Sequence, residues 1–326
     1  MTDAGEIEEA CNLSMTSAYR LLHAMWEEPE RPLFHYTSPE ALLKILETQT
    51  ILATDARYLN DSEELVYVAR VVAHVVASIE ADTFETRSLA WDIEAEVVHE
   101  DAPWSAFVAC FTTQGDQLSQ WRAYAGDGAG YAIGLSKQTR LTSPDGRIVP
   151  LVPVSYARGE QEDMLRPLIE PVVRAYDGFA KRGLPIAVEK ARGTLFKFFA
   201  DLARAFAPVM KNPGFAEEEE WRFVVRYRPE NPPTGVAYRA GRFGVTPHLP
   251  LTEEGKRLQV KHVVLGPKLK SDIGEIAMKQ LLQSHSLNVA RLLDTPAFSP
   301  THPDRLSWEP PEHHTVLITH SRTSYR

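Results

Sequence analysis

The pattern of apolar and polar positions predicts a helix at the start of the chain, then a strand and a second helix. Over residues 1–30, apolar side chains recur at helical spacing, which predicts an amphipathic lead-in helix that packs against the rest of the protein. Residues 33–37 predict a short strand. The next helix has a well-marked start, because Ser38 is a suitable N-cap, Pro39 suits the first turn and Glu40 favours the positive end of the helix dipole.

The rest of the chain predicts strands separated by long helical segments. Continuous or alternating apolar residues predict strands at 51–54, 106–111, 131–135, 151–156, 221–227 and in VKHVVLGP from Val260. Helices are predicted over 61–100, 160–210 and 273–283, and the proline-containing segments 229–250 and 295–315 are predicted to be loops. Because the strands and helices do not alternate regularly, the pattern favours an α+β fold over a doubly wound sheet.

Composition and charge exclude several classes of protein. Across 326 residues there are 35 Lys and Arg against 44 Asp and Glu, a net charge of −9 that would repel a phosphate backbone and excludes bulk coating of nucleic acid. Cys11 and Cys110 form no C-x-x-C pair, so neither a disulfide framework nor a thiolate zinc site is expected. The acidic start lacks an apolar core and no apolar run approaches the roughly 20 residues of a spanning helix. We therefore expect a cytoplasmic protein that does not enter membranes.

The sequence lacks the common motifs of metal and nucleophile chemistry. The 11 histidines are scattered, and no H-E-x-x-H, G-x-S-x-G or Walker pattern occurs, so no metal site is expected. The cluster GDGAGYAIG precedes a predicted strand, whereas a dinucleotide-binding fingerprint follows one. These glycines favour a turn in which the backbone closely approaches a ligand or another strand.

Two short segments combine polar and aromatic residues. The segment LSQWRAY could stack on a flat ring and bind its polar edge through Ser119, Gln120, Trp121, Arg122 and Tyr124. An amphipathic turn whose Trp121 fills the core is the simpler interpretation. In HYT, the residues from His35 to Thr37 end a strand just before a capped helix, where side chains converge on a cleft. A histidine in a strand is also common as an ordinary core or surface residue.

Four adjacent glutamates, 217–220, lead into the strand WRFVV. In an extended conformation Glu218 and Glu220 point to one side, and Arg222 shares that face. A glutamate pair at a strand end can bind a ribose hydroxyl and stabilise positive charge that develops on a sugar ring. Arg222 could keep these carboxylates ionised, or could neutralise them for structural reasons alone.

Six motifs occur in one order between about Leu33 and Arg326: HYTS, YLNDSEE, ACF, LSQWRAYAGDGAGYAIG, FAEEEEWR and SRTSYR. In this set the chain resembles a bacterial family of uncharacterised function. It is also remotely similar to the ADP-ribosyltransferase superfamily. There, a strand-end histidine followed by Thr or Ser precedes a helix, a later segment contributes a serine and a ring-stacking aromatic residue, and a glutamate opens a late strand.

This resemblance implies a role for each matching residue. His35 and Thr37 would contact the ribose and the nicotinamide amide of NAD, Trp121 or Tyr124 would stack on the nicotinamide, and Ser119 would lie near its ribose. The candidate NAD-binding residues are His35, Tyr36, Thr37, Ser119, Trp121, Arg122 and Tyr124. Glu220 would be the catalytic glutamate and Glu218 its E-x-E partner, although Glu218, Glu219 and Glu220 are not distinguished by sequence alone.

The resemblance implies a split β-sheet of the ADP-ribosyltransferase type over residues 31–326, as a single domain with helical insertions at about 61–100 and 160–210. The implied activity is NAD-dependent transfer of ADP-ribose to a protein or nucleic acid, in a bacterial toxin, defence or stress role, with NAD as substrate and no metal. An inhibitory protein partner is left open. The alternatives are a non-catalytic module that binds a nucleotide or nucleic acid, NAD hydrolysis, and transfer of an RNA 2′-phosphate to NAD. The last would need arginines near the phosphate, with Arg57, Arg122 and Arg222 as candidates.

Overall fold

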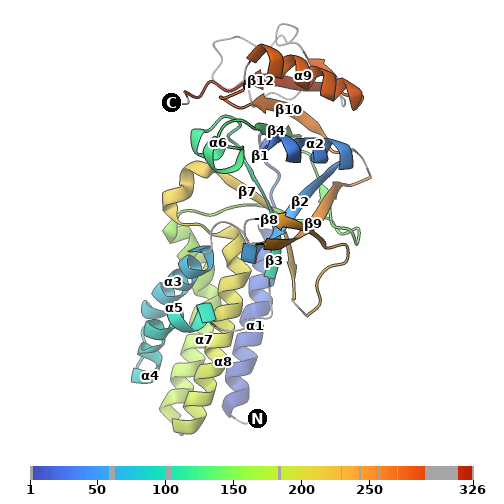
Figure 1. Cartoon of the computed structure of the whole chain (residues 1–326). Coiled ribbons are helices and arrows are strands. Elements are labelled where there is room, and N and C mark those ends of the chain that lie inside the picture. The colour runs from blue at the N-terminus through green and yellow to red at the C-terminus, as the bar shows by residue number, and fades with distance from the viewer. Residues whose placement is uncertain are drawn as a thin grey trace.

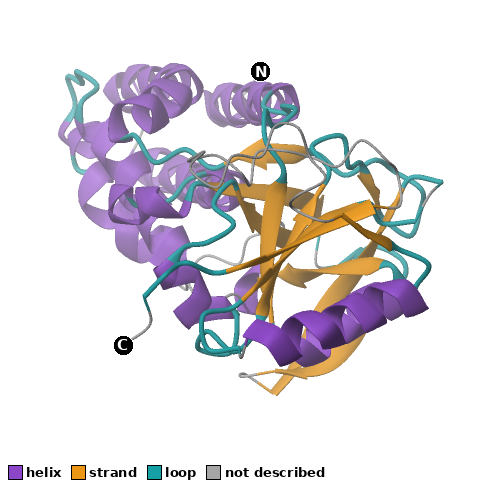
Figure 2. Ribbon diagram, turned by 90° about the horizontal axis from the view of Figure 1, so that it is seen from above, coloured by secondary structure: helices purple, strands orange, loops and turns teal. Residues whose placement is uncertain are grey.

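The fold joins a group of long helices to one large β-sheet (Figure 1). The computed structural model describes residues 3–58, 63–99, 105–182, 185–228, 230–241, 244–255, 257–269, 271–290 and 315–324. Figure 2 shows the helical part lying to one side of the sheet. No helix among the described residues combines the length and apolar character that crossing a membrane requires.

The helical part brings together three segments that are distant in sequence. It contains α1 (Asp3–Ala24), α3 (Glu63–Ala77), α4 (Phe84–Arg87), α5 (Leu89–His99), α7 (Arg158–Arg182) and α8 (Pro185–Phe206). The lead-in helix α1 packs against α7 and α8 (Figure 1), as its apolar spacing predicts. The core of this part includes Val72 and Phe199 and continues to the sheet at Val108 and Val224. The two predicted helical segments therefore form one layer with α1.

The sheet is mixed, and most of its strand pairs are antiparallel. Its strands are β1 (Leu33–Thr37), β2 (Thr50–Asp55), β3 (Ser105–Thr112), β4 (Tyr131–Leu135), β5 (Leu141–Thr142), β6 (Leu151–Pro153), β7 (Glu220–Tyr227), β8 (Ala237–Gly241), β9 (Gly244–Glu253), β10 (Val260–Leu265), β11 (Asn288–Ala290) and β12 (Thr315–His320). The main order is β11-β12-β10-β4-β1-β3-β2-β9-β5, and β7, β6 and β8 branch from it. The mixed open sheet confirms that the chain combines helices and strands without a doubly wound arrangement.

The sheet forks at β3. One edge of β3 pairs with β7 along its whole length, from Ser105 opposite Tyr227 to Thr112 opposite Glu220. Its other edge is shared, because Val108 pairs with Thr54 of β2 whereas Thr112 pairs with Phe34 of β1. Between these two points β1 and β2 diverge and leave a gap in the hydrogen-bonded ladder.

Three shorter helices complete the described fold: α2 (Pro39–Thr48), α6 (Leu118–Tyr124) and α9 (Ser271–Ser284). The predicted start of α2 is confirmed, because the Ala41 amide donates to the Ser38 side chain at 3.2 Å. Leu42 and Leu46 of α2 pack on the sheet together with Ile51 and Phe107. The hydrophobic face of α2 thus covers the sheet beside the fork.

The prediction of a loop over 229–250 is wrong, because β8 and most of β9 lie there. The prolines of β9 are tolerated at positions where a described strand pairs with only one edge. Pro247 pairs with β8 before β2 begins, and Pro250 pairs with β2 between the stretches that β8 and β5 occupy. A proline nitrogen that faces an open edge costs no ladder hydrogen bond.

The predicted loop 295–315 lies outside the described residues except for Thr315, which begins β12. β11 and β12 were not predicted and extend the sheet with two parallel pairs. The predicted strand 151–156 is shorter in the structure, where β6 ends at Pro153. Asp61 and Ser62, which are suitable cap residues for the helix predicted from residue 61, also lie outside the described residues.

Candidate functional site

A cavity of about 120 Å³ lies where the forked sheet, α6 and the helical layer meet. β1 contributes His35 and Tyr36 to its lining, and α6 contributes Gln120 and Tyr124. This volume is much smaller than a dinucleotide. Tyr124 is 41% exposed, so the cavity reaches the protein surface at this residue.

The first residues of β7 carry the charges of the cavity. Glu220 and Arg222 are two positions apart on a strand and therefore point to the same face, toward the helical layer. Both line the cavity, where the helical side adds Glu64, from the first turn of α3, and Lys211. Glu220 is 6% exposed and Arg222 is 1% exposed, so their charges are buried.

Arg222 links two carboxylates that come from different parts of the fold. Its Nη1 and Nη2 donate to the two oxygens of Glu64 at 3.0 and 2.5 Å. Its Nε and Nη2 donate to Oε2 of Glu220 at 3.0 and 2.6 Å. Burial opposes the charge of Arg222, but the Glu220 and Glu64 carboxylates hold its pKa well above the usual value. The network ties the helical layer to the start of β7.

Lys211 forms a second contact between the acidic run and the cavity. Its Nζ lies 2.6 Å from Oε2 of Glu218 and 3.8 Å from Oε2 of Glu220. Burial raises the pKa of Glu218 although Lys211 opposes this shift. Burial also disfavours the charged form of Lys211, but Glu220 and Glu218 raise its pKa above the usual value. Glu218 therefore approaches Glu220 through their shared contact with Lys211.

The acidic run is not extended, in contrast to the sequence-based prediction. Pro213–Glu218 form a 3₁₀ helix, and Glu219 takes a left-handed conformation with φ of 42°. This turn directs the Glu219 carboxylate away from the cavity. Outside the cavity, the carboxylate accepts hydrogen bonds from Thr113 and, at 2.9 Å, from Gln114 Nε2. As predicted, the side chains of Glu218 and Glu220 lie together and that of Glu219 points elsewhere. The cause is a turn and not the alternation of side chains along a strand.

Several polar atoms at the cavity have no hydrogen-bond partner among the described residues. Oε2 of Glu220 receives Arg222, whereas Oε1 accepts no hydrogen bond from any described residue. Gln120 is 6% exposed and lines the cavity, yet its carboxamide is not hydrogen-bonded to the described part of the chain. Buried amides are normally hydrogen-bonded, so these groups are suited to a ligand.

His35 fills the gap left by the fork. Its Nδ1 lies 2.9 Å from the carbonyl oxygen of Cys110, a β3 residue located between the two strands that share this edge. Burial lowers the pKa of His35, so the ring is neutral and Nδ1–H donates. Nε2 is then an acceptor, and no described residue donates to it. Burial also raises the pKa of the Cys110 thiol to about 12, so this cysteine stays protonated beside the cavity.

Tyr36 and Trp121 make contacts that stabilise the fold. The Tyr36 hydroxyl donates to the Gln114 carbonyl at 2.8 Å, and its ring meets Trp121 edge-on with centroids 4.7 Å apart. Trp121 is fully buried, and its Nε1 donates to Asp116 at 2.9 Å. Thr37, Ser119, Trp121 and Arg122 do not line the cavity, and Arg122 is exposed. Of Arg57, Arg122 and Arg222, only Arg222 lines it.

The glycine-rich turn allows the backbone to approach β1 closely. A Cβ on Gly130 would collide with the carbonyl oxygen of Thr37. On β4, a Cβ on Gly134 would lie 2.7 Å from Cβ of His262 and 2.8 Å from Phe34. These contacts confirm the interpretation of the turn as a close approach to another strand.

Sequence reasoning missed Glu64 and Lys211 at the cavity, and it named Gln120 within LSQWRAY without assigning it to the site. Glu64 ends the motif YLNDSEE and Gln120 lies inside LSQWRAY, so both had a local signal. Lys211 follows the apolar stretch APVM and had none. Its role depends on the turn that brings Glu218 and Glu220 to it.

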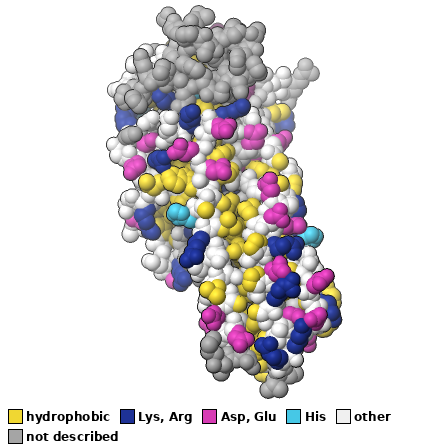
Figure 3. Space-filling view, turned by 180° about the vertical axis from the view of Figure 1, so that it is seen from behind, with side chains coloured by type: hydrophobic (Ala, Val, Ile, Leu, Met, Phe, Trp, Pro, Cys, Tyr) yellow, Lys and Arg dark blue, Asp and Glu magenta, His cyan; other side chains and the backbone are white. Residues whose placement is uncertain are grey.

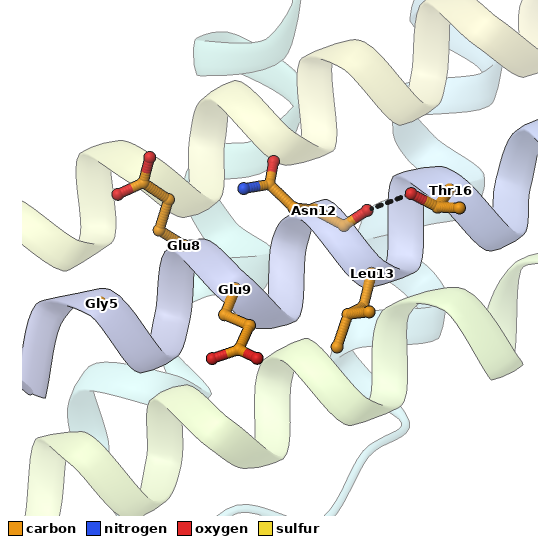
Figure 4. Close-up of a pocket in the computed structure, with 6 residues that line it drawn as sticks. All are labelled: Gly5, Glu8, Glu9, Asn12, Leu13 and Thr16. Carbon is orange, nitrogen blue, oxygen red and sulfur yellow. Dashed lines mark hydrogen bonds between the residues drawn. The ribbon is translucent and has the colours of Figure 1, made fainter. Parts of the chain in front are cut away.

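A larger hollow of about 350 Å³ lies along α1, between Gly5 and Thr16 (Figure 4). It is formed by the surface of one helix, and Leu13 in its wall is 63% exposed. The Thr16 hydroxyl donates to the carbonyl of Asn12 and is thereby occupied within the helix. This hollow does not gather groups from different elements and is a weaker candidate than the cavity at the fork. In the part of the chain that the structure describes, no three His, Cys, Asp or Glu residues are placed to hold a metal ion.

Comparison with known proteins finds one family similarity, which covers part of the chain. Residues 120–223 match the model of a family described as a protein of unknown function (DUF2971). The matched segment begins at Gln120 and includes Tyr124, Lys211, Glu220 and Arg222. No curated protein and no solved structure matches the chain. The expected similarity to a family of uncharacterised function is confirmed over this segment.

Proposed function

We propose that the cavity binds the nicotinamide and adjoining ribose of NAD, and that the protein transfers ADP-ribose from NAD to a macromolecular acceptor. One observation carries the proposal: unpaired polar atoms of Glu220 and Gln120 meet in the same cavity as neutral His35 and half-exposed Tyr124. The unpaired atoms are the hydrogen-bonding groups that an amide and a sugar hydroxyl require.

The size and lining of the cavity suit the nicotinamide end of NAD. The carboxamide of Gln120 can donate to and accept from the amide of nicotinamide, as a paired amide does. Tyr124 presents an aromatic ring at the cavity mouth, where it can stack on the nicotinamide. The remainder of the dinucleotide would extend out of the cavity along the protein surface, because about 120 Å³ cannot enclose it.

Glu220 is placed to act on the ribose. Its free Oε1 can accept a hydrogen bond from a ribose hydroxyl, and its negative charge favours the positive charge that develops on the sugar when the bond between nicotinamide and ribose breaks. The bonding electrons leave with neutral nicotinamide. A nucleophile on the acceptor then forms the new bond to the same carbon and gives up its proton. The hydrogen bonds from Arg222 to Oε2 orient the Glu220 carboxylate.

The fork in the sheet supports the resemblance to the ADP-ribosyltransferase superfamily. The divergence of β1 and β2 at β3 is consistent with a split sheet, and the strand-end histidine and the glutamate that opens a late strand line the same cavity. His35 and Glu220 are far apart in sequence, and the helical segments between them account for the long spacing.

The acceptor is inferred only as a class. On the described part of the face shown in Figure 3, acidic and basic side chains are interspersed, with no single basic surface. This distribution agrees with the net charge of −9 and favours a protein over a nucleic acid as acceptor.

A second function, nucleotide binding without turnover, is favoured by one specific observation. Arg222 and Lys211 both lie against Oε2 of Glu220, and two cations reduce the negative charge that a carboxylate offers to a transition state. Under this alternative the cavity binds NAD and the glycosidic bond stays intact. Release of nicotinamide separates the two functions.

The direct test uses the full chain, NAD labelled in its adenylate half and total cell extract as acceptor. The proposed function predicts release of nicotinamide together with label on macromolecules, and a fall of at least about a hundredfold in Glu220→Gln. Glu219→Gln is the matched control, because this neighbouring carboxylate points away from the cavity. Nicotinamide release with no labelled acceptor would assign NAD hydrolysis. Equal activity in the two variants would contradict the role of Glu220.

A further inference from the structure

A second polar group lies beside the fork and is not part of the cavity. Arg239 on β8 donates from Nε to Nε2 of His248 on β9, at 2.6 Å. His248 is opposite Thr54 of β2, and its Nδ1 lies 3.1 Å from the Thr54 hydroxyl. Thr54 is also the residue at which β2 pairs with Val108 of β3, next to the gap. The three residues therefore form a chain of contacts from β8 to the fork.

His248 orients Arg239 without neutralising it. The imidazole is 2% exposed, and burial followed by the nearby Arg239 charge lowers its pKa to about 4. The neutral ring accepts from Arg239 at Nε2, so its proton is on Nδ1 and donates to Thr54. A neutral partner fixes the guanidinium and leaves its positive charge in place.

Arg239 has no acidic partner among the described residues. This distinguishes it from Arg57, which is paired with Asp55, and from Arg222, which is paired with Glu64 and Glu220. Only Nε of Arg239 is engaged, which leaves the Nη1 and Nη2 donors open, and the side chain is exposed on the edge strand β8. A fixed guanidinium with two open donors is suited to bind phosphate oxygens.

The position of Arg239 relates it to the cavity. His35 occupies the gap between β1 and β2, and Thr54 stands at the opposite side of that gap. The charge of Arg239 also acts on His35, where it adds to the effect of burial in lowering the pKa of the ring. His248 and Thr54 thus connect Arg239 to the edge of the gap that His35 occupies.

We propose that Arg239 is an anion-binding residue that holds a phosphate group of the nucleotide whose ribose end occupies the cavity. The assignment of that nucleotide as NAD rests on the proposed function, whereas the phosphate site itself does not. His248 and Thr54 are positioning residues, because they fix the guanidinium and do not contact the ligand.

The test is calorimetric titration of the full-length protein with three probes: NAD, nicotinamide riboside and inorganic pyrophosphate. The riboside shares the cavity-bound half of NAD and lacks phosphate. We expect Arg239→Gln to weaken NAD about ten- to hundredfold, which corresponds to the loss of charge-assisted hydrogen bonds, and to leave riboside affinity unchanged. Arg239→Lys should recover part of the NAD affinity because it keeps the charge. Arg257→Gln, which removes an exposed charge elsewhere, is the control.

The outcomes separate this inference from the proposed function. Unchanged NAD affinity in Arg239→Gln would overturn the phosphate site and leave the NAD proposal standing. Equal loss of NAD and riboside binding would also overturn it, since the substitution would then act on the cavity as a whole. Pyrophosphate binding that Arg239→Gln abolishes, in a protein that binds neither NAD nor riboside, would support the phosphate site and refute NAD as the ligand.

Discussion

Arg222 occupies one carboxylate oxygen of Glu220 and leaves the other open to the cavity. Its Nε and Nη2 lie 3.0 and 2.6 Å from Oε2. The pair therefore fixes the direction of the carboxylate, while the same guanidinium holds Glu64 of the helical layer. In this arrangement a residue that stabilises the fold also prepares the group that would act on a ligand.

Arg222→Met should destabilise the protein by about 3–5 kcal/mol, because Glu64 and Glu220 would be left buried without their partner. Urea unfolding followed by circular dichroism measures this change. Arg147→Ala is the control, since Arg147 pairs with Asp145 at the surface with its side chain 83% exposed, and it should cost less than about 1 kcal/mol. Similar losses in the two variants would contradict the network as a structural link.

Substitutions at Trp121 and Tyr124 should have different effects, because Trp121 contributes to stability and Tyr124 to ligand binding. Trp121→Phe removes the hydrogen bond to Asp116 and part of a fully buried side chain, so it should lower the free energy of unfolding by about 1–3 kcal/mol and leave NAD affinity unchanged. Tyr124→Ala should weaken NAD about tenfold through loss of stacking, with little effect on stability. Loss of NAD affinity in Trp121→Phe at normal stability would contradict this division.

His248 should make the protein less stable in acid. Its pKa falls from 6.5 to about 4 in the folded protein, so between these values the unfolded chain takes up a proton that the folded chain does not. Stability therefore decreases as the pH falls from about 6.5 to about 4, by at most about 3 kcal/mol at about 1.4 kcal/mol per pH unit.

His248→Gln keeps an acceptor for Arg239 and a donor for Thr54 but does not titrate. The difference in unfolding free energy between pH 7 and pH 4.5 should accordingly be smaller in this variant than in the wild type. The same acid sensitivity in both proteins would show that other groups control it.

Local sequence signals predicted the elements whose causes are local. β1, β3 and β4 follow from short apolar runs, and the start of α2 follows from Ser38 and Pro39. The sequence pattern does not predict β8 and β9, because the prolines of this segment indicate a loop. Whether Pro247 and Pro250 are tolerated depends on which edge of β9 carries a partner strand, and that is a property of the whole sheet.

The same distinction applies to the candidate site. His35, Tyr36, Tyr124 and Glu220 were identified from motifs and line one cavity. The interpretation of Trp121 as a core residue is confirmed, whereas the resemblance alone did not decide whether Trp121 or Tyr124 lines the cavity. Lys211 reaches the cavity only because the chain turns at Glu219, a left-handed residue that four identical glutamates do not reveal.

The most direct test of the central claim is calorimetric titration of NAD into the wild-type protein, Gln120→Leu and Gln283→Leu. Gln120 is buried and unpaired at the cavity, whereas Gln283 is exposed near the end of α9. We predict saturable binding to the wild type and to Gln283→Leu, and at least about tenfold weaker binding to Gln120→Leu. Absence of NAD binding to the folded wild type, or equal affinity in all three proteins, would contradict the assignment of the cavity as a nicotinamide site.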